Sequence, residues 1–345
     1  MRAKTTLSEN FPRQHDLDRV LGFFSALHLA RHPCFILDFI TSHPAVPAVQ
    51  TGCRGMPDNF HMSTFNFPVP HHRYARVLSI AGSDSGGGAG IQADLKTFSA
   101  LGCYGMTAIT ALTAQNTCGV SSIHPVPPEF LKAQLQAVIE DIGVDAVKIG
   151  MLHSPEIVRV VAWAISHYKL TQVVLDPVMV ATSGDRLIES ATVQVLQKEL
   201  FPLVSVITPN LDEAALLLGR DIDSAEALEH AADDLLALGA RTVLLKGGHL
   251  RGAVVVDVFA QAGQRHLHLR SERIASRNVH GTGCTLSSAI AAHLALGLPL
   301  REAVQQARNY ILAAITAGAG VQTGQGHGPL NHGHAPLAMA VVPLD

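Results

Sequence analysis

The stretch RVLSIAGSDSGGGAG, residues 76–90, decides the fold of this chain. Its first six residues form a short apolar run with β-branched side chains, which predicts a β-strand. The glycines and serines that follow predict a loop. Ile91, Leu95 and Phe98 then recur at helical spacing, and Gly102 ends that helix. A strand, a glycine-rich loop and a helix in this order are typical of an α/β unit whose loop meets a ligand.

The alternation of strands and helices continues towards the C-terminus. Further strands are expected at 146–149, 173–175, 204–207 and 242–245. Helices are expected at about 128–141, 154–167, 189–200, 211–239, 283–296 and 301–317, and Gly219 is expected to split the fourth of them. Residues 254–259 and 266–269 have no helix between them, which predicts an antiparallel edge hairpin. This order predicts the α/β class, with a mostly parallel sheet covered on both faces.

Composition and charge restrict the class of protein. Of the 345 residues, 48% are hydrophobic and 15% are charged, as expected for a globular chain with a sizeable core. The net charge of −3 gives no electrostatic footprint for nucleic acid, and no apolar run is long enough to span a membrane. The cysteines are scattered and include no CxxC pair, so a disulfide framework or zinc site is not expected and a cytoplasmic location is favoured.

The first part of the chain differs from the rest. Residues 1–72 are rich in His, Pro, Phe and Asn, have no regular apolar period and lack the features of a secretory signal. Met56 and Met62 are alternative start positions. We therefore expect residues 1–72 to be a disordered or spurious extension, residues 73–337 to be one domain and residues 338–345 to be a C-terminal tail.

Polar residues and glycines follow each predicted parallel strand. Because ligands of such sheets bind beyond the carboxyl ends of the strands, these residues are expected to line one site. Turn chemistry is the alternative for any one of them, since Gly and Asp are good turn formers. The segments are Gly82-Ser83-Asp84, Gly150-Met151, Asp176-Pro177, Thr208-Pro209-Asn210 and Lys246-Gly247-Gly248.

A second glycine-rich segment, NVHGTGCTLS at residues 278–287, precedes an apolar helical run. The first N–H groups of a helix have no partner within the helix, and the helix dipole favours negative charge in front of them. Gly281 and Gly283 leave room for a phosphate to approach the backbone. This pattern predicts an anion hole for a phosphoryl group, formed by Gly281, Thr282, Gly283 and Cys284. A glycine-rich helix cap with an inert buried cysteine is the alternative.

The other polar residues fit phosphoryl transfer. Asp176 and Glu213 are hard oxygen ligands suited to Mg²⁺, and Lys246 can offset charge on nucleotide phosphates. Capping of the helix that follows Pro209 is an alternative role for Asn210 and Glu213. The sequence contains neither a GxxxxGK[ST] phosphate loop nor a GxGxxG dinucleotide loop, so a kinase of this sequence would cradle phosphate by other means.

The motifs resemble those of the hydroxymethylpyrimidine/phosphomethylpyrimidine kinases of thiamine biosynthesis, which belong to the ribokinase-like superfamily. The resemblance covers residues 75–335 and rests on six blocks in the same order. These are AGSDSGGGAGIQADLKT at 81–97, KIGML at 148–152, LDPVM at 175–179, TPNLDEA at 208–214, KGGH at 246–249 and HGTGCT at 280–285.

This resemblance implies a three-layer α/β/α fold, the use of ATP with Mg²⁺, and phosphorylation of the pyrimidine's hydroxymethyl group and then of the monophosphate. It assigns Gly281 to Cys284 to the anion hole, and Asn210 with Glu213 to an NxxE element that arranges Mg²⁺ and phosphates. We also expect a homo-oligomer, specifically a dimer. The residues that resemble the pyrimidine pocket are Gly82, Asp94, Gln115, Met151 and Val178.

Three functions remain open at this stage. The first is the bifunctional pyrimidine kinase, in which Cys284 stands where most sugar kinases of the superfamily have an aspartate base. A helix N-terminus lowers a thiol pKa, so Cys284 is a candidate proton acceptor, although packing or hydrogen bonding is its alternative role. The second is a pyridoxal or pyridoxine kinase of the same superfamily. The third is a non-catalytic pyrimidine sensor, which the intact Asp176, Glu213 and Cys284 argue against.

Overall fold

The computed structural model describes residues 71–179, 188 and 190–344. The extension predicted for residues 1–72 therefore lies outside the described residues except for its last two positions. The strands are β1 His72–Tyr74, β2 Arg76–Asp84, β3 Tyr104–Asn116, β4 Gly119–Pro125, β5 Ala146–Ile149, β6 Val173–Leu175, β7 Val206–Ile207, β8 Thr242–Leu245, β9 Val254–Gln261, β10 Leu267–Glu272 and β11 Val341–Pro343. The helices are α3 Gly90–Ala100, α4 Pro128–Asp141, α5 Pro155–His167, α6 Ser190–Val195, α7 Leu211–Leu218, α8 Ala227–Ala237, α9 Thr282–Ala295 and α10 Leu300–Gly318.

A central sheet organises the described part of the chain. Its strand order is β10-β9-β8-β7-β6-β5-β2-β3-β4. The six strands from β8 to β3 in that order run parallel, whereas β9, β10 and β4 are antiparallel to their neighbours. The predicted hairpin of residues 254–259 and 266–269 is confirmed as β9 and β10, which close one edge of the sheet.

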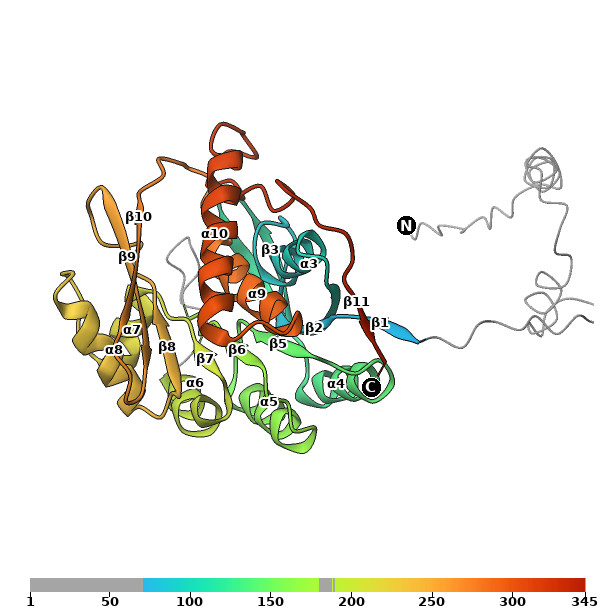
Figure 1. Cartoon of the computed structure of the whole chain (residues 1–345). Helices are drawn as coiled ribbons and strands as arrows, with labels where there is room; N and C mark the ends of the chain where they lie inside the picture. The colour runs from blue at the N-terminus through green and yellow to red at the C-terminus, as the bar shows by residue number, and fades with distance from the viewer. Residues whose placement is uncertain (1–70, 180–187, 189, 345) are drawn as a thin grey trace, which may run out of the picture. The chain divides into compact units, whose positions relative to one another are not determined.

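Helices cover both faces of this sheet, so the predicted three-layer α/β/α sandwich is confirmed. Figure 1 shows α3, α9 and α10 on one side and α4, α5 and α6 on the other. Successive strand residues enter different cores: Ala146 packs with the α9 layer and Val147 packs with the α5 layer. Because both faces are buried, the central strands β6 and β7 are apolar throughout.

Three elements differ from the expectation. The long strand β3 and the edge strand β4 were not predicted, and β3 is rich in Thr and Ala while most of β4 is exposed. The helix expected at 189–200 begins at Ser190 and changes to a π-helical turn over Leu196–Leu200. By contrast, the predicted split of residues 211–239 into two helices is confirmed, and the first of them ends at Gly219.

The segment predicted as a C-terminal tail contains β11, which pairs with β1 in a separate two-stranded sheet. Ala340 donates its backbone N–H to Gly102, and Leu337 donates to Ala100, so this segment runs along the end of α3. Within the described ranges, the helices include none with the length and apolar character required to cross a bilayer.

Candidate functional site

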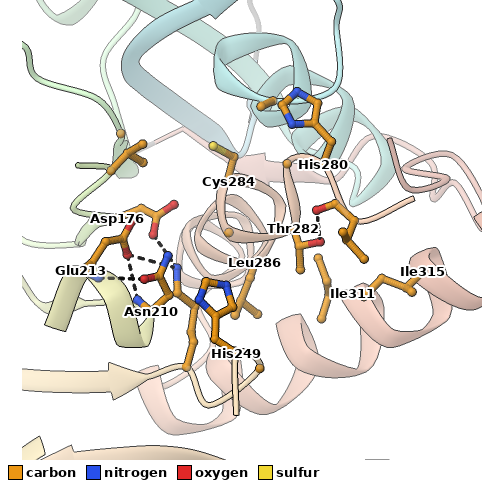
Figure 2. Close-up of a pocket in the computed structure, with 18 of the residues that line it drawn as sticks. Asp176, Asn210, Glu213, His249, His280, Thr282, Cys284, Leu286, Ile311 and Ile315 are labelled. Atoms are coloured by element: carbon orange, nitrogen blue, oxygen red, sulfur yellow. Dashed lines mark hydrogen bonds and ion pairs between the residues drawn. The ribbon is translucent and has the colours of Figure 1, made fainter. Parts of the chain in front are cut away.

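A cavity of about 800 Å³ lies beyond the carboxyl ends of the parallel strands. Figure 2 shows Asp176, Glu213 and Asn210 on one side of it and the start of α9 on the other. Every predicted site residue except Asp94 lines this cavity, namely Gly82, Gln115, Met151, Asp176, Val178, Asn210, Glu213, Lys246, Gly281, Thr282, Gly283 and Cys284. Segments from both ends of the domain therefore converge on one site.

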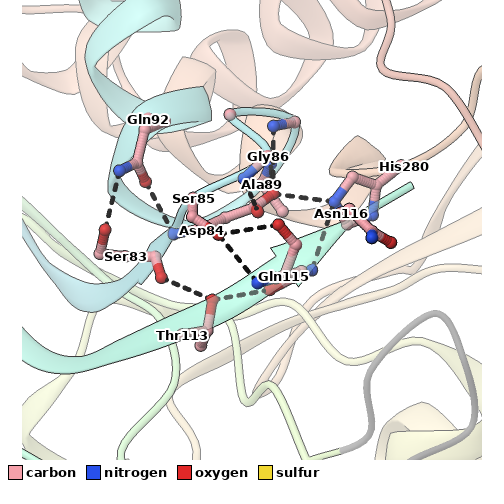
Figure 3. A network of polar contacts seen from close by, with 12 residues as sticks. Ser83, Asp84, Ser85, Gly86, Ala89, Gln92, Thr113, Gln115, Asn116 and His280 are labelled. Carbon is pink, nitrogen blue, oxygen red and sulfur yellow. Dashed lines mark hydrogen bonds and ion pairs between the residues drawn. The ribbon is translucent and has the colours of Figure 1, made fainter. Parts of the chain in front are cut away.

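The glycine-rich loop after β2 is arranged around the carboxylate of Asp84, as Figure 3 shows. Its Oδ1 accepts the N–H of Gly86 at 2.8 Å, and its Oδ2 accepts the N–H groups of Gly88 and Ala89 at 3.0 and 2.8 Å. The imidazole Nε2 of His280 lies 2.9 Å from the same Oδ2. Burial opposes ionisation of Asp84, but the hydrogen bonds from His280, Ala89 and Gly86 outweigh it and lower its pKa.

Helix α9 begins directly against this loop. Gly281 precedes its first residue with φ of 82°, in the left-handed region that glycine tolerates best. A Cβ at Gly281 would lie 1.9 Å from the carbonyl oxygen of Gly88, so no other residue fits without displacing the loop. The predicted anion-hole segment and the glycine-rich loop are therefore packed backbone to backbone.

Asp94 lies behind the cavity wall and is fully buried. Lys148 Nζ contacts both of its carboxylate oxygens, at 2.8 and 2.9 Å. The hydroxyls of Ser79 and Ser288 donate to it at 2.5 and 2.7 Å. These contacts differ from the direct pyrimidine contact that the resemblance implies for Asp94, and Lys148 is the member of the pair that lines the cavity.

Cys284 lies in the first turn of α9. The sequence led us to expect a lowered thiol pKa at this helix start, but burial dominates and raises the pKa of Cys284 to about 11. The nearby positive charge of Lys148 and a backbone hydrogen bond from Gly90 act in the opposite direction and do not overcome burial. At neutral pH the side chain is therefore predominantly a thiol.

The opposite wall of the cavity carries the two predicted metal ligands. Asp176 Oδ1 contacts Lys246 Nζ at 2.8 Å and accepts the hydroxyl of Thr208 at 3.0 Å. Lys246 Nζ also lies 3.9 Å from Glu213 Oε2. Burial raises the pKa of Glu213 to about 7, with Lys246 opposing and Asp176 adding to the shift. The two carboxylates and the amine of Lys246 therefore form one coupled group.

Asn210 and Glu213 also form the capping box of α7. Asn210 Oδ1 accepts the N–H of Glu213 at 2.9 Å, and Glu213 Oε2 accepts the N–H of Asn210 at 2.8 Å. The capping alternative considered for these residues is thus present in the structure. Capping uses Oε2 of Glu213 only, and the described residues supply no hydrogen bond to its Oε1 or to Oδ2 of Asp176.

The carboxylates of Asp176 and Glu213 fit Mg²⁺ if water and substrate phosphates supply the remaining ligands. The described residues include no cluster of three or more His, Cys, Asp or Glu side chains that could hold a metal. Mg²⁺ is commonly held by one or two carboxylates together with water and substrate phosphates. Asp176 and Glu213, which face a cavity large enough for a phosphate chain, fit that arrangement.

One part of the cavity was not predicted. Its apolar wall combines Leu286 of α9 with Ile311, Leu312 and Ile315 of α10, and Figure 2 shows Ile311 and Ile315 on the side away from Glu213. Asp84, His280 and Lys148 also line the cavity without having been assigned roles. Lys148 could have been recognised as a candidate from the sequence, because it is the one charged residue within the otherwise apolar strand β5.

Comparison with known proteins agrees with this geometry. The family model for phosphomethylpyrimidine kinase matches residues 84–331. The chain is 53% identical to the hydroxymethylpyrimidine/phosphomethylpyrimidine kinase of Rhizobium meliloti over 261 residues, which cover 75% of this chain and 97% of that protein. It is also 53% identical over 268 residues to a thiamine biosynthesis bifunctional protein of Geobacter sulfurreducens; the match covers 78% of this chain but only 54% of that protein.

Solved structures resemble the described fold. Phosphomethylpyrimidine kinase from Clostridium difficile is 44% identical, with a TM-score of 0.61 over 70% of this chain and 99% of that one. Pyridoxal kinase from Bacillus subtilis, solved as an ADP complex, is 40% identical, with a TM-score of 0.70 over 75% and 98%. The chain therefore belongs to the hydroxymethylpyrimidine/phosphomethylpyrimidine kinase family and is a phosphotransferase with the ribokinase-like fold.

Proposed function

We propose that this enzyme transfers the γ-phosphoryl group of ATP to the hydroxymethyl group of 4-amino-5-hydroxymethyl-2-methylpyrimidine, and then phosphorylates the resulting monophosphate to the diphosphate. One observation carries the proposal. The glycine-rich loop after β2 and the start of α9 meet through Asp84 and His280 and border a single cavity with a polar wall and an apolar wall. Such a cavity can hold a small polar ring and a nucleotide side by side.

We assign the pyrimidine to the end of the cavity near β2 and β3. Gly82 offers backbone groups there, and Met151 and Val178 offer apolar contact to a ring. Gln115 can present both a donor and an acceptor to an aminopyrimidine edge. Its Nε2 lies 3.4 Å from Nε2 of His280, so the side chain that would recognise the ring touches the residue before the anion hole.

We assign the nucleotide to the opposite end. The apolar wall of Leu286, Ile311 and Ile315 suits the face of a purine, and similar pyridoxal kinases have been solved as complexes with ADP or AMP-PCP. Lys246, which contacts Asp176, and Asn210 also line the cavity and could contact the nucleotide phosphates. Burial opposes the charge of Lys246, but Asp176 and Glu213 outweigh it and raise the pKa of the amine, so Lys246 stays positively charged for these phosphates.

Asp176 and Glu213 would hold Mg²⁺ through their uncommitted oxygens, and the ion would supply charge neutralisation to the nucleotide phosphates. The N–H groups at the start of α9 would bind the oxygens of the migrating phosphoryl group. As the hydroxymethyl oxygen bonds to the γ-phosphorus, the bond to the β-phosphate oxygen breaks and ADP leaves. The thiolate form of Cys284, a minor fraction at neutral pH, is our candidate acceptor of the hydroxyl proton.

Product analysis tests the function. Purified enzyme with ATP, Mg²⁺ and the hydroxymethylpyrimidine should give the monophosphate first and then the diphosphate. Binding of the pyrimidine without ATP turnover would favour the sensor and remove the kinase assignment.

Pyridoxal is the second candidate substrate, because pyridoxal kinases of 34–40% identity share the fold. Measured kcat/KM for the two alcohols under the same conditions decides between them. We further propose that the enzyme is a cytoplasmic homodimer; light scattering of the purified protein tests the assembly, and a monomer at micromolar concentration would contradict it.

A further inference from the structure

A buried ion pair lies outside the set of groups given a role above. Asp257 of β9 and Arg308 of α10 are 7% and 8% exposed, and Arg308 Nε contacts Asp257 Oδ2 at 2.8 Å. Removing two charges from water is costly, and apolar residues of similar volume often serve stability as well or better. Stability alone is therefore a weak explanation for the pair, and its other contacts indicate what it does.

The second carboxylate oxygen of Asp257 holds the backbone of the Lys246 loop. The β8–β9 ladder ends with Leu245 opposite Val258. Beyond that point, the N–H of Gly247 donates to Asp257 Oδ1 at 2.9 Å instead of to a strand carbonyl. The preceding residue is Lys246, whose own N–H donates to the carbonyl of Pro209 at 2.9 Å. The backbone on both sides of the Lys246 side chain is thus fixed.

The backbone of Gly247 packs so closely against β9 that no side chain fits there. A Cβ at this position would lie 2.0 Å from the carbonyl oxygen of Val256. The rest of the loop is tied by Arg273, whose guanidinium donates to the carbonyls of Gly248, Leu250 and Gly252. Asp257 therefore anchors the start of a loop that is held along its length.

Arg308 connects this anchor to the apolar wall. It lies one turn before Ile311 and Leu312 on α10, and all three residues line the cavity. Its Nη1 and Nη2 donate to the carbonyl of Arg270 and the hydroxyl of Ser271 on β10, at 3.2 and 3.1 Å. One guanidinium thereby joins α10, β10 and, through Asp257, the loop that carries Lys246.

We propose that Asp257 and Arg308 are positioning residues for the nucleotide: they fix the Lys246 loop relative to the apolar wall, and Asp257 does so through its hydrogen bond from Gly247. This inference depends on the assignment of the nucleotide to that end of the cavity. Removing the anchor should weaken nucleotide binding and slow turnover while leaving pyrimidine binding unchanged, a pattern that general destabilisation does not produce.

Two double variants separate the hydrogen bond from the ion pair. Asp257→Leu with Arg308→Met replaces the pair by apolar side chains and removes the acceptor for Gly247. Asp257→Asn with Arg308→Met also removes both charges, but it keeps an amide oxygen that can accept from Gly247. Leaving the buried backbone N–H of Gly247 without an acceptor carries a free-energy penalty that typically reduces affinity, here for the nucleotide, by about tenfold.

The measurements are steady-state kinetics and calorimetric binding of AMP-PCP. The leucine variant should raise KM for ATP and weaken AMP-PCP binding by about tenfold, with KM for the pyrimidine changed less than about twofold. The asparagine variant should stay within about threefold of the parent enzyme. Equal AMP-PCP affinity in the two double variants, whether unchanged or equally reduced, would overturn the proposal.

A third variant covers the case in which the leucine variant does not fold. Gly247→Ala leaves Asp257 and Arg308 intact but must displace the loop from Val256. It should give the same increase in KM for ATP, and an unchanged value would contradict the proposal. If the parent enzyme bound AMP-PCP but failed to phosphorylate the pyrimidine, the function proposed above would fail while the binding comparison would still test the anchor.

Discussion

Nε2 of His280 lies 2.9 Å from Oδ2 of Asp84, although the two residues are 196 positions apart in the chain. Asp84 orders the loop after β2, and His280 precedes the glycine that starts α9. Their contact therefore sets the position of the proposed phosphoryl site relative to the proposed pyrimidine site. Because transfer depends on the alignment of the two reacting groups, this contact should matter more for turnover than for stability.

The first prediction concerns that contact. His280→Ala removes the ring that joins the loop to α9, and we expect kcat to fall by about 10- to 100-fold, since small misplacements of reacting groups cost rates of this order. His327→Ala, at an exposed histidine near the same region, is the matched control and should leave kcat unchanged. A His280→Ala enzyme with parental kcat would show that alignment does not depend on the contact.

The second prediction concerns Cys284 and pH. If the thiolate takes the proton, the active fraction grows with pH up to the pKa of about 11. We therefore expect log kcat to rise by about one per pH unit between pH 7 and 10. Cys284→Ala should lower kcat by about a hundredfold or more and abolish that slope, with little change in nucleotide affinity. Pre-steady-state measurement of the chemical step gives the test, and a flat profile in the parent enzyme would refute the base role.

The third prediction separates capping from metal binding at Glu213. Glu213→Gln can keep the capping box but removes a negative charge, so the Mg²⁺ concentration for half-maximal activity should rise about tenfold. Burial raises the pKa of Glu213 to about 7, so the folded state binds the proton more tightly than the unfolded chain, and stability falls as pH rises from 4.5 to 7.

Glutamine has no such titration. The variant should therefore match the parent in Tm near pH 4 and equal or exceed it at pH 8. An unchanged Mg²⁺ requirement would leave capping as the role of Glu213.

The fourth prediction concerns Asp94. Asp94→Asn leaves the fully buried amine of Lys148 without its counter-ion, and breaking a buried pair in this way costs about 3–5 kcal/mol. For a domain of this size we expect a fall in Tm of about 10 °C. Asp94→Asn combined with Lys148→Met removes the stranded charge and should recover most of the loss in thermal unfolding.

The double variant also tests the contact with substrate that the resemblance implies for Asp94. If Asp94 acts only through the buried pair and its serine partners, KM for the pyrimidine should stay within a few-fold of the parent value. Because Lys148 itself lines the cavity, Lys148→Met alone is the control, and a KM increase much larger in the double variant than in this control would favour direct contact of Asp94 with the ring.

Local patterns predicted the parts of the fold that local physics determines. The apolar run before Gly82, the helical spacing after Gly90 and the stop at Gly219 depend on neighbouring residues, and each appears in the structure. Strand β3 was missed because its Thr and Ala residues give a weak period-two signal, and it is stabilised by pairing with β2 along most of its length. A strand whose stability depends on pairing with another segment is hard to predict from its own sequence.

The site was predictable where the polar residues follow strands, because sheet topology alone brings those positions together. The partners of Asp94 in α3 could not be predicted in this way, since Lys148 lies on strand β5 and Ser288 on helix α9. The apolar wall was missed for a different reason. Ile311 and Ile315 have the spacing of a helix face that covers a sheet, and the same spacing serves a face that borders a cavity.

The pairing of β1 with β11 has a practical consequence for engineering. Leu344 donates its backbone N–H to the carbonyl of His71 at 3.0 Å, so the two ends of the described domain are already in contact. A short linker from 344 to 71 could close the backbone into a ring, and new termini could be opened at Gly263, where an added Cβ would meet no other atom within 4 Å. A permuted enzyme of this design would keep β1 and β11 covalently joined, so any loss of activity could be traced to the β9–β10 turn.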